Sequence, residues 1–299
     1  MASELISIGL SVIDYLFLCD GPVHGRSGGA ADHLVQGGGL AATAAVAMAR
    51  LGGRAEMWSR VGDDDAGRFI LEQFRQEGVD TSQVRVRPGA RSPACAVTVD
   101  RSKAERYFTY YGGRDLDPSA AGLDLGRIDG AKAMLVDCSW IEAQLAAARR
   151  AQERGVPVCA DVSGLSDRAA ELIRLTDYPI YSADCARRYG ATGTPEGDLR
   201  KVAALGGKAP MITLGSEGCI WLEDGEVQRL PAFRVEVVDT TGCGDTFHGA
   251  FTFGLSRGWD VRRNARFASA TAALKCRALG GRTGIPTYDE VEAFLRGHP

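Results

Sequence analysis

The sequence predicts an α/β fold with three layers, in which helices cover both faces of a mostly parallel central sheet. In the second half of the chain, short apolar runs alternate with helical patterns, and such βαβ series form parallel sheets. Two glycine turns lead directly into apolar helices, at residues 37–52 and from residue 242 onward. No internal repeat, low-complexity segment or linker interrupts the pattern, so residues 1–299 are expected to form a single domain.

Each expected element follows from its local pattern. Apolar runs of strand length predict strands at residues 5–10, 55–61, 84–87, 133–136, 157–161 and 211–214. Apolar residues spaced three to four apart predict helices after both glycine turns and at residues 66–77, 141–154, 167–175, 196–205 and 266–276. Gly52 and Gly53 are placed to end the first of these helices.

A small second sheet is expected outside this series. Residues 93–99 and 106–111 are β-rich and are joined by a polar turn, which predicts a hairpin that pairs with residues 15–36. The small sheet therefore spans about 15–36 and 92–113. Within it, residues 25–29 match the serine-hydrolase elbow Gly-x-Ser-x-Gly, but both flanks are loop-like, and a mobile flap is the better interpretation.

Composition argues against several classes of function. The 299 residues are 45% hydrophobic, enough to bury a substantial core, and carry a formal net charge of -3. This balance disfavours nucleic acid and membrane surfaces as partners, and neither a signal peptide nor a membrane-spanning stretch is evident. Because no Cys-x-x-Cys pair occurs, zinc or redox chemistry is disfavoured and a reducing cytoplasm fits. The scattered cysteines are Cys19, Cys95, Cys138, Cys159, Cys185, Cys219, Cys243 and Cys276.

The most informative stretch runs from residue 238 to residue 251, where a polar, glycine-bearing loop opens an apolar helix. Gly242 and Gly244 let a ligand approach the backbone closely, and the first N–H groups of the helix form a ready anion site. Asp245 lies at the mouth of that site, where a carboxylate makes sense if it removes a proton from an attacking hydroxyl. The alternative is a tight turn in which Asp245 is an ordinary helix N-cap.

Other carboxylates and phosphate signatures are less informative. Asp63, Asp64 and Asp65 favour the charge cluster of a helix N-terminus over a metal site. No Gly-x-x-x-x-Gly-Lys-Ser/Thr occurs, and no Gly-x-Gly-x-x-Gly lies between a strand and a helix, which disfavours P-loop enzymes and dehydrogenases. Asp14 follows the first expected strand, where open α/β sheets bind ligands, but a turn residue explains it equally well.

The segment from Asp239 to Ala250, Asp-Thr-Thr-Gly-Cys-Gly-Asp-Thr-Phe-His-Gly-Ala, resembles the C-terminal signature of the ribokinase (PfkB) family of small-molecule kinases. Residues 37–52, a glycine turn followed by a helix ending Arg-Leu-Gly, are similar to the family's N-terminal signature. The resemblance implies a ribokinase-like α/β/α core with a β-sheet lid, and ATP-dependent phosphorylation of a sugar or sugar-like alcohol with Mg²⁺. Its implied catalytic groups are Asp245 as general base for a primary hydroxyl and the backbone N–H groups of Gly242, Cys243 and Gly244.

The resemblance also implies binding residues elsewhere in the chain. Substrate contacts are expected at Asp14, Gly38, Gly39, Thr43, Tyr110 and Ser139, and nucleotide contacts at Thr213, Gly215, Gly218 and Thr241. Asp239 and Thr241 would border a monovalent cation such as K⁺. The lid would cover the sugar and would also join two subunits into a homodimer.

The chain departs from the family pattern at several of these positions. Thr43 stands where the family usually has Asn, and Ser182 and Cys185 stand where it tends to have the Asn and Glu that help organise Mg²⁺ and phosphate. These changes keep open a non-catalytic sugar-binding or regulatory relative. The intact loop at residues 242–245 favours the kinase instead.

The identity of the substrate stays open at this stage. Residues 37–46 and 272–286 are most similar in detail to sulfofructose kinases, which grip a sulfonate with basic and amide side chains. The matching positions here carry Ser27, Tyr110 and Ser139, so a neutral ketose or another carbohydrate fits equally well. Fructokinase-like, ketodeoxygluconate-kinase-like and nucleoside-kinase-like substrates are the alternatives.

Overall fold

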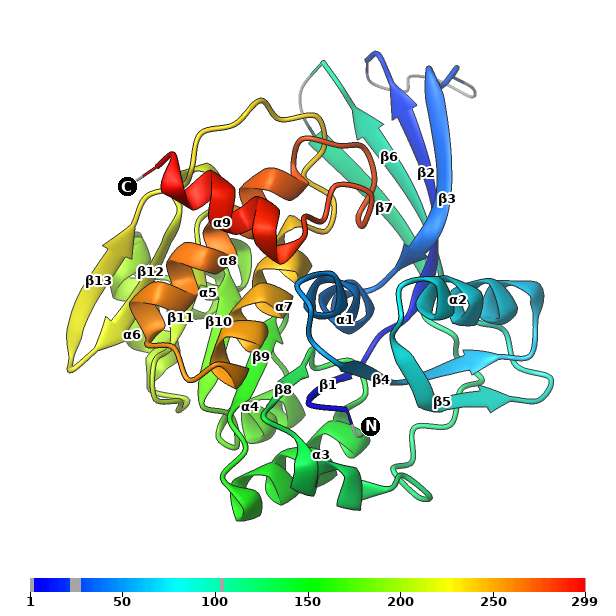
Figure 1. The fold of residues 1–299 in the computed structure, drawn as a ribbon, viewed down its shortest axis with the longest axis horizontal. Coiled ribbons are helices and arrows are strands. Elements are labelled where there is room, and N and C mark those ends of the chain that lie inside the picture. The colour runs from blue at the N-terminus through cyan, green and yellow to red at the C-terminus, as the bar shows by residue number, and fades with distance from the viewer. Residues whose placement is uncertain (1–2, 22–27, 103–104, 299) are drawn as a thin grey trace.

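A nine-stranded sheet runs through the centre of the molecule (Figure 1). The computed structural model describes residues 3–21, 28–102 and 105–298. The strand order is β13-β12-β11-β10-β9-β8-β1-β4-β5, and neighbours are parallel except at the antiparallel edge formed by β11, β12 and β13. The strands are β1 (Leu5–Ile8), β4 (Ala55–Gly62), β5 (Asp80–Arg87), β8 (Ala133–Val136), β9 (Val158–Val162), β10 (Tyr178–Ser182), β11 (Met211–Thr213), β12 (Cys219–Glu223) and β13 (Glu226–Leu230).

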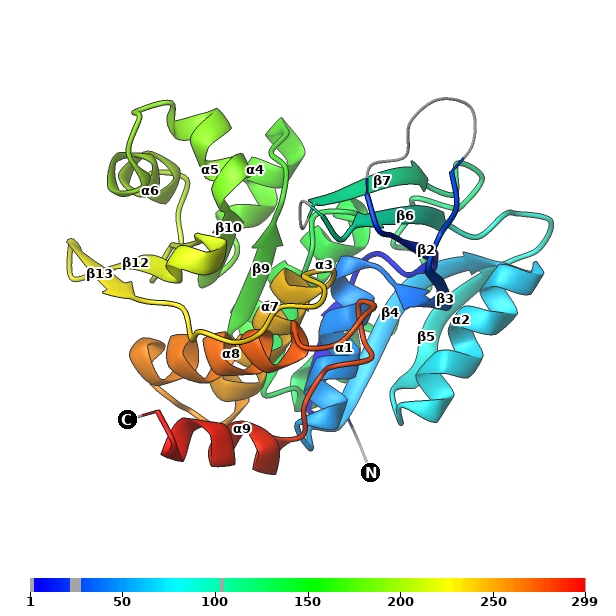
Figure 2. The same cartoon turned by 90° about the horizontal axis from the view of Figure 1, so that it is seen from above.

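Helices cover both faces of this sheet and complete three layers (Figure 2). Neighbouring residues of one strand serve different layers, because side chains alternate across a sheet. Leu135 packs into the core under α7, whereas Met134 and Val136 pack into the core under α3. The first face carries α1 (Leu40–Arg50), α2 (Asp65–Gln76), α7 (Cys243–Ser256) and α8 (Val261–Lys275), with α9 (Tyr288–Arg296) against α8, and the second carries α3 (Ile141–Arg154), α4 (Asp167–Ile173), α5 (Ala183–Gly190) and α6 (Pro195–Ala203).

The helix starts fall into two kinds. Most begin at a Ser, Thr or Asp whose side chain accepts a hydrogen bond from the first turn, as at Asp64, Asp260 and Thr287. By contrast, α1 begins at Gly39 and α7 begins at Gly242, both with positive φ and without a side-chain cap. In α1, the N–H groups of Ala41 and Ala42 instead bond to the Asp137 carboxylate and to the carbonyl oxygen of Leu10. In α7, no side chain caps the first turn, and the N–H of Gly244 lies on its open side.

A separate four-stranded sheet, which we call the lid sheet, stands beside one end of the main sheet (Figures 1 and 2). Its order is β3-β2-β6-β7, with β2 and β6 parallel and the outer pairs antiparallel. Leu16, Val97 and Val99 lie on its buried face in a small apolar core. The strands are β2 (Val12–Cys19), β3 (Asp32–Gly38), β6 (Ala94–Asp100) and β7 (Glu105–Tyr111).

The predicted three-layer fold with a small second sheet is confirmed, and most element ends agree within a few residues. The helix at Ile141–Arg154 was predicted with its observed bounds. The sequence patterns missed β10, α5, α9 and the β12–β13 hairpin. Asp14 was expected just past a strand, but it lies inside β2 of the lid sheet. Among the described residues, no helix is long and apolar enough to cross a bilayer. Most of the suggested flap at residues 25–29, including Ser27, lies outside the described residues.

Candidate active site

The loop that opens α7 is shaped by two glycines with different surroundings. Gly242 is the N-cap residue with φ 73°, and a Cβ there would lie 2.5 Å from the carbonyl oxygen of Gly281. Gly244 is exposed, and a Cβ there would meet no atom within 4 Å. Between them, the thiol of Cys243 lies against the thiol of Cys276, with the two sulfurs 2.6 Å apart. The open side of the loop is therefore the backbone face beside Gly244.

Asp245 is the third residue of α7, so the prediction's alternative, in which Asp245 is the N-cap, is wrong. It carries the only acidic side chain in the first turn of this helix. Burial raises the pKa of Asp245 to about 7, and the carboxylates of Asp161, Asp14 and Asp137 add to the rise while His248 opposes it. A carboxyl group with this pKa is poised to accept a proton near neutral pH.

His248 lies one turn further along α7 and links Asp245's helix to the main sheet. Its Nδ1 lies 2.6 Å from the carbonyl oxygen of Gly244 and 3.3 Å from Oδ2 of Asp161. Asp161 lies near the carboxyl end of β9, and both side chains are buried. Burial raises the pKa of Asp161 to about 8 and lowers the pKa of His248, so both groups are driven towards their neutral forms. His248 and Asp161 together therefore anchor the carbonyl oxygen of Gly244 to the main sheet.

Asp137 directly follows β8, and its carboxylate accepts several hydrogen bonds from neighbouring segments. Its Oδ2 accepts the N–H groups of Leu10 and Ala41, at 2.8 and 3.2 Å. Its Oδ1 accepts the Ser139 hydroxyl at 2.5 Å and the Gln144 side-chain amide at 2.8 Å. Ser139, a predicted substrate residue, is exposed and is held in place by this carboxylate.

The predicted substrate residues of the lid sheet and of α1 lie together. The carboxylate of Asp14 rests on Gly38, since a Cβ at Gly38 would come within 1.9 Å of Oδ2 of Asp14. Gly39 has φ 96°, and its Cα lies close to the carbonyl oxygen of Leu10. Burial raises the pKa of Asp14 to about 6, an effect that the positive charge of Arg282 reduces. Asp14, Gly38 and Gly39 therefore form one polar surface where the lid sheet meets the start of α1, and we call this surface the floor.

Arg282 supports this floor from the loop after α8. The guanidinium is 3% exposed and donates from Nη2 to the carbonyl oxygen of Gly38 at 3.1 Å. Its Nε lies 3.5 Å from the Thr43 hydroxyl, and Thr43 is itself buried. Arg50 in turn donates to the carbonyl oxygen of Arg282 at 2.7 Å. Thr43 therefore supports the floor through Arg282.

The lid sheet presents one row of side chains beside Asp14. Strand register places Asp14 beside Cys95, and Cys95 beside Tyr110, so these three side chains lie in one row. Tyr110 is 52% exposed, and its partial burial raises its pKa, an effect to which the charge of Asp137 adds. Further along β7, Arg106 donates to the carbonyl oxygen of Thr240 at 2.6 Å. This bond ties the lid sheet to the loop that opens α7.

The predicted nucleotide residues form two groups. Thr213 ends β11, with its hydroxyl 3.4 Å from the carbonyl oxygen of Tyr181, and Gly215 follows it in an exposed turn. Gly218 has φ 95°, and a Cβ there would lie 2.0 Å from the carbonyl oxygen of Leu230, so its packing alone requires glycine. Thr241 is buried and bonded through its N–H and hydroxyl to Asp239.

The segment that contains Ser182 and Cys185, where the family tends to have Asn and Glu, provides few ligands for Mg²⁺. Ser182 caps α5 by accepting the N–H of Cys185, whose thiol is buried. Asp184 is exposed and paired with Arg187. Among the described residues, no cluster of three His, Cys, Asp or Glu side chains is arranged to hold a metal ion.

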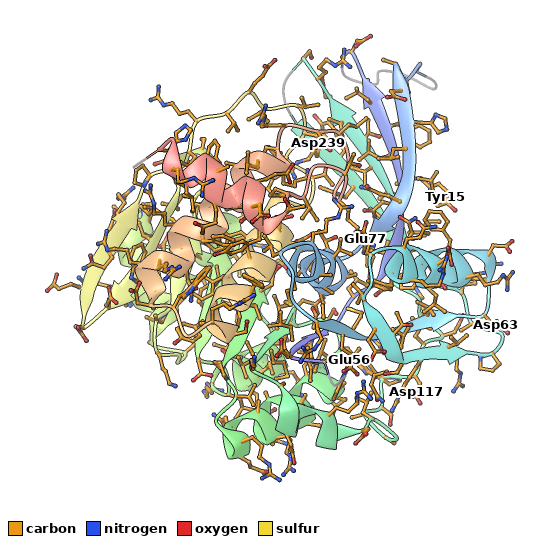
Figure 3. The ribbon with its side chains drawn as sticks, viewed as in Figure 1. Tyr15, Glu56, Asp63, Glu77, Asp117 and Asp239 are labelled. Carbon is orange, nitrogen blue, oxygen red and sulfur yellow. The ribbon has the colours of Figure 1, made fainter. Side chains whose placement is uncertain are left out.

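The oxygens of Asp239 do not fit a free monovalent cation. Oδ1 accepts both the N–H and the hydroxyl of Thr241, and Oδ2 accepts the N–H of Gly280, each at 2.8 Å. The main-chain oxygen accepts the ammonium of Lys275 at 3.1 Å. Figure 3 shows Asp239 on the side of the main body that faces the lid strands. Each oxygen of this residue already has a donor.

Sequence reasoning missed five residues that shape this site: Asp137, Asp161, His248, Lys275 and Arg282. Two of them carried a usable signal. Asp137 directly follows one predicted strand and Asp161 ends another, and carboxyl ends of parallel strands are where such sheets bind ligands. The other three lie in helices or loops whose packing partners are distant in sequence.

Two surface hollows of about 300 Å³ each lie elsewhere. One is lined by Arg60, Arg85 and Asp117, and the other lies between the lid sheet and α2 beside Tyr15 and Arg91. Neither includes Asp245. The site is therefore defined by the convergence of backbone N–H groups and buried carboxylates, not by the shape of these hollows.

Comparison with known proteins gives a consistent result over nearly the whole chain. The family described as pfkB family carbohydrate kinase matches residues 2–288. Aminoimidazole riboside kinase of Salmonella typhimurium is 33% identical over 282 residues, covering 87% of this chain and 88% of that protein. Ribokinase of Bacillus subtilis is 28% identical over 259 residues, covering 86% of this chain and 87% of that protein.

Comparison with solved structures gives the same family. The structure of Arabidopsis thaliana ribokinase complexed with ribose and ATP superposes with a TM-score of 0.86 at 26% identity, covering 99% of each chain. An Agrobacterium tumefaciens structure gives a TM-score of 0.92 at 31% identity, covering 99% of this chain and 98% of that one. The similarity thus spans the main sheet, the lid sheet and the loop at α7 together. The chain belongs to the PfkB family of carbohydrate kinases.

Proposed function

We propose that this kinase transfers the γ-phosphoryl group of ATP to a hydroxyl of a sugar or sugar-derived alcohol. One observation carries the proposal: Asp245, with its raised pKa, stands in the first turn of α7, beside the open backbone face of Gly244. Positioned N–H groups and a base beside them are what phosphoryl transfer to an alcohol requires.

Each group then has a distinct role. Asp14 and the backbone of Gly38 and Gly39 hold the sugar hydroxyls, with Tyr110 and Ser139 at the edge of the same floor. Asp245 accepts the proton of the reacting hydroxyl, which we take to be primary. The N–H groups of Gly242 and Gly244 stabilise the charge on the transferring phosphoryl group. The N–H of Cys243, predicted for the same role, donates to the carbonyl oxygen of Thr240 at 3.2 Å and helps to shape the loop. ATP would bring Mg²⁺, which would neutralise phosphate charge, and Asp161, whose charge acts on Asp245, would be the carboxylate to support the ion once ionised.

Nucleotide binding is proposed on the other side of the loop. Thr213 ends β11 and Gly215 follows it, and Thr241 precedes the loop. Gly218 supports the turn after β11 by allowing its close contact with the end of β13. These residues would hold ATP, with its last phosphate at the open backbone face of Gly244.

The substrate class that we favour is a neutral furanose, as a free sugar or a riboside. The two relatives described above are named for ribose-bearing substrates. The lid row beside Asp14 carries Cys95 and Tyr110, which offer no positive charge to a sulfonate. Sulfofructose is the competing substrate that the motif detail suggests.

An ADP-release screen over sugars, ribosides, sugar acids and sulfofructose tests the proposal and ranks these substrates. We expect Asp245→Asn to reduce turnover by about 10²–10⁴-fold while ATP binding persists. Asp184→Asn is the matched control, because Asp184 is exposed in an ion pair. If the Asp245→Asn variant turned over as fast as the unaltered chain, Asp245 would be removed from the mechanism. Sugar binding without ADP release would favour the regulatory relative.

We also propose that the protein is a cytoplasmic homodimer joined through the lid sheet. The lid face opposite Asp14 exposes Tyr15, Phe17, Val35 and Tyr107, and exposed apolar faces of this kind mark contact surfaces. The free state of all eight cysteines suits a reducing compartment. Light scattering on the intact chain and on Phe17→Lys tests the dimer, and a monomeric unaltered chain would refute it.

A further inference from the structure

Lys275, the last residue of α8, is wholly buried, with 0% of its side chain exposed. Lysine is almost never fully buried unless its charge has a partner, because removing an ammonium from water is costly. Its Nζ donates to the carbonyl oxygen of Asp239 at 3.1 Å. The positive charge also lies near the thiols of Cys243 and Cys276. The contact between these thiols raises the pKa of Cys243 and lowers the pKa of Cys276, and the charge of Lys275 acts to lower both. Lys275 thus brings a fixed monovalent cation to the segment that opens the catalytic loop.

The surroundings of this ammonium are built around it. Asp239 is 2% exposed, and its carboxylate is held by Thr241 and Gly280. The N–H groups of Val238 and Asp239 bond to the carbonyl oxygen of Cys276, which fixes the segment against the end of α8. The carboxylate, the carbonyl oxygens and the ammonium therefore belong to one closed and rigid arrangement.

A cation at this place acts on the catalytic loop through the backbone. Because a trans peptide is planar, its carbonyl and its N–H point in opposite directions. Lys275 fixes the carbonyl of Asp239, and Arg106 fixes the carbonyl of Thr240. The orientation of the peptides leading into Gly242 is thereby set by two side-chain cations, one from α8 and one from the lid sheet.

We propose that the Lys275 ammonium is the resident monovalent cation of the catalytic loop, so that this kinase needs no free K⁺ or other monovalent ion. The donor set at Asp239 agrees, since its oxygens already have partners. Because it concerns the loop that binds the phosphoryl group, the kinetic part of this inference rests on the proposed function. Melting measurements need no substrate and test it separately.

The first test uses the unaltered protein in chloride salts of potassium, sodium and tetramethylammonium at equal ionic strength. Equal ionic strength holds charge screening constant. We expect the melting temperature and the rate of ADP release to be the same in all three salts. A melting temperature or rate that rises specifically with K⁺ would overturn the proposal.

The second test removes the ammonium. In Lys275→Ala, which leaves room for an ion, we expect ADP release in tetramethylammonium to fall by about tenfold or more, because a small misplacement of the catalytic loop lowers the rate steeply. Potassium or ammonium chloride should restore part of the rate and raise the melting temperature along a saturating curve. Lys275→Met, which fills the space, should lose the rate without rescue. Lys201→Ala, an exposed lysine on α6, is the control and should behave like the unaltered chain.

Two results for a folded Lys275→Ala protein would refute the inference. One is full activity in tetramethylammonium, and the other is a loss that no monovalent cation relieves in rate or in melting temperature. If this variant does not fold, the salt comparison on the unaltered chain still decides. If the unaltered chain phosphorylates no sugar in the panel, the proposed function fails, while the melting curves continue to report on the cation.

Discussion

The corner where α7 begins and the inner face of the lid sheet use burial in opposite ways. At the corner, Asp239, Lys275 and Arg282 are each at most 3% exposed, and their hydrogen bonds connect three separate segments. On the lid sheet, Phe108 and Tyr110 lie on the same face as Asp14 and are more than half exposed. From this contrast we infer that the two regions have different roles. The corner fixes the geometry of phosphoryl transfer, and the lid sheet adapts to the substrate.

The strongest way to break this division is to disturb the corner. Gly242→Ala would place a methyl group against the Gly281 carbonyl at a residue with φ 73°. We expect a loss of about 1–2 kcal/mol of unfolding free energy from the backbone conformation alone, and more from the overlap. Turnover should fall by about 10²–10³-fold, since the loop N–H groups lose their alignment. Chemical denaturation and ADP release measure the two effects.

Gly244→Ala is the matched variant, because its Cβ would meet no protein atom. Its free energy of unfolding should stay close to that of the unaltered chain, while turnover falls because the methyl group enters the space beside the phosphoryl group. Equal stability losses in both variants would show that the corner is not the rigid element described above.

Sequence patterns could predict the corner's backbone but not its support. Gly242, Gly244 and Asp245 are contiguous, and their chemistry is evident from a local string. Lys275 and Arg282 act on residues that lie 36 and 244 positions away in sequence, at Asp239 and Gly38. Such contacts depend on how α8 and the loop after it pack, and no local period encodes that. For the same reason the fold class was predictable, whereas the short strand β10 between α4 and α5 was missed.

The pH dependence of turnover probes the corner without mutation. Asp245 must be ionised to accept a proton, and its pKa is about 7. We expect kcat/KM to fall about tenfold per unit as the pH drops below 7, and to level off above it. Bound Mg²⁺ and ATP would shift the midpoint in kcat, because the ion's charge favours the carboxylate. A profile that is flat from pH 5 to pH 8 would contradict the role of Asp245.

Asp245 also makes the free energy of unfolding depend on pH, but this free energy falls with rising pH whereas turnover rises. Its pKa in the folded chain lies above the ordinary value of 3.8, so the unfolded chain loses the proton more readily. The contribution to the free energy of unfolding is full below pH 3.8 and is lost as the pH rises through about 7. Asp245→Asn should therefore raise the melting temperature at pH 8 by a few degrees and leave it nearly unchanged near pH 4.

Asp14 belongs to the lid sheet, but its carboxylate lies against Gly38 just before α1, so its substitution separates sugar binding from phosphoryl transfer. We expect Asp14→Asn to raise the KM for the sugar by about tenfold, because a charged acceptor of sugar hydroxyls is lost, while the KM for ATP stays the same. Asp20→Asn is the control, since Asp20 lies exposed past the end of β2. A change confined to the ATP constant would place Asp14 outside the sugar site.

The smallest effect is expected on the lid sheet itself. Tyr110→Phe removes one hydroxyl from a half-exposed ring, and a hydrogen bond at such a position contributes about 0.5–1.5 kcal/mol. We expect the KM for the best sugar to rise only a few-fold, with kcat kept, and the ranking of substrates in the panel to change. Tyr107→Phe, on the opposite face of the same strand, is the control and should leave the ranking intact. A fall in kcat as large as that of the corner variants would mean that Tyr110 helps to align the reacting hydroxyl, and the lid would then share in the chemistry instead of selecting the substrate.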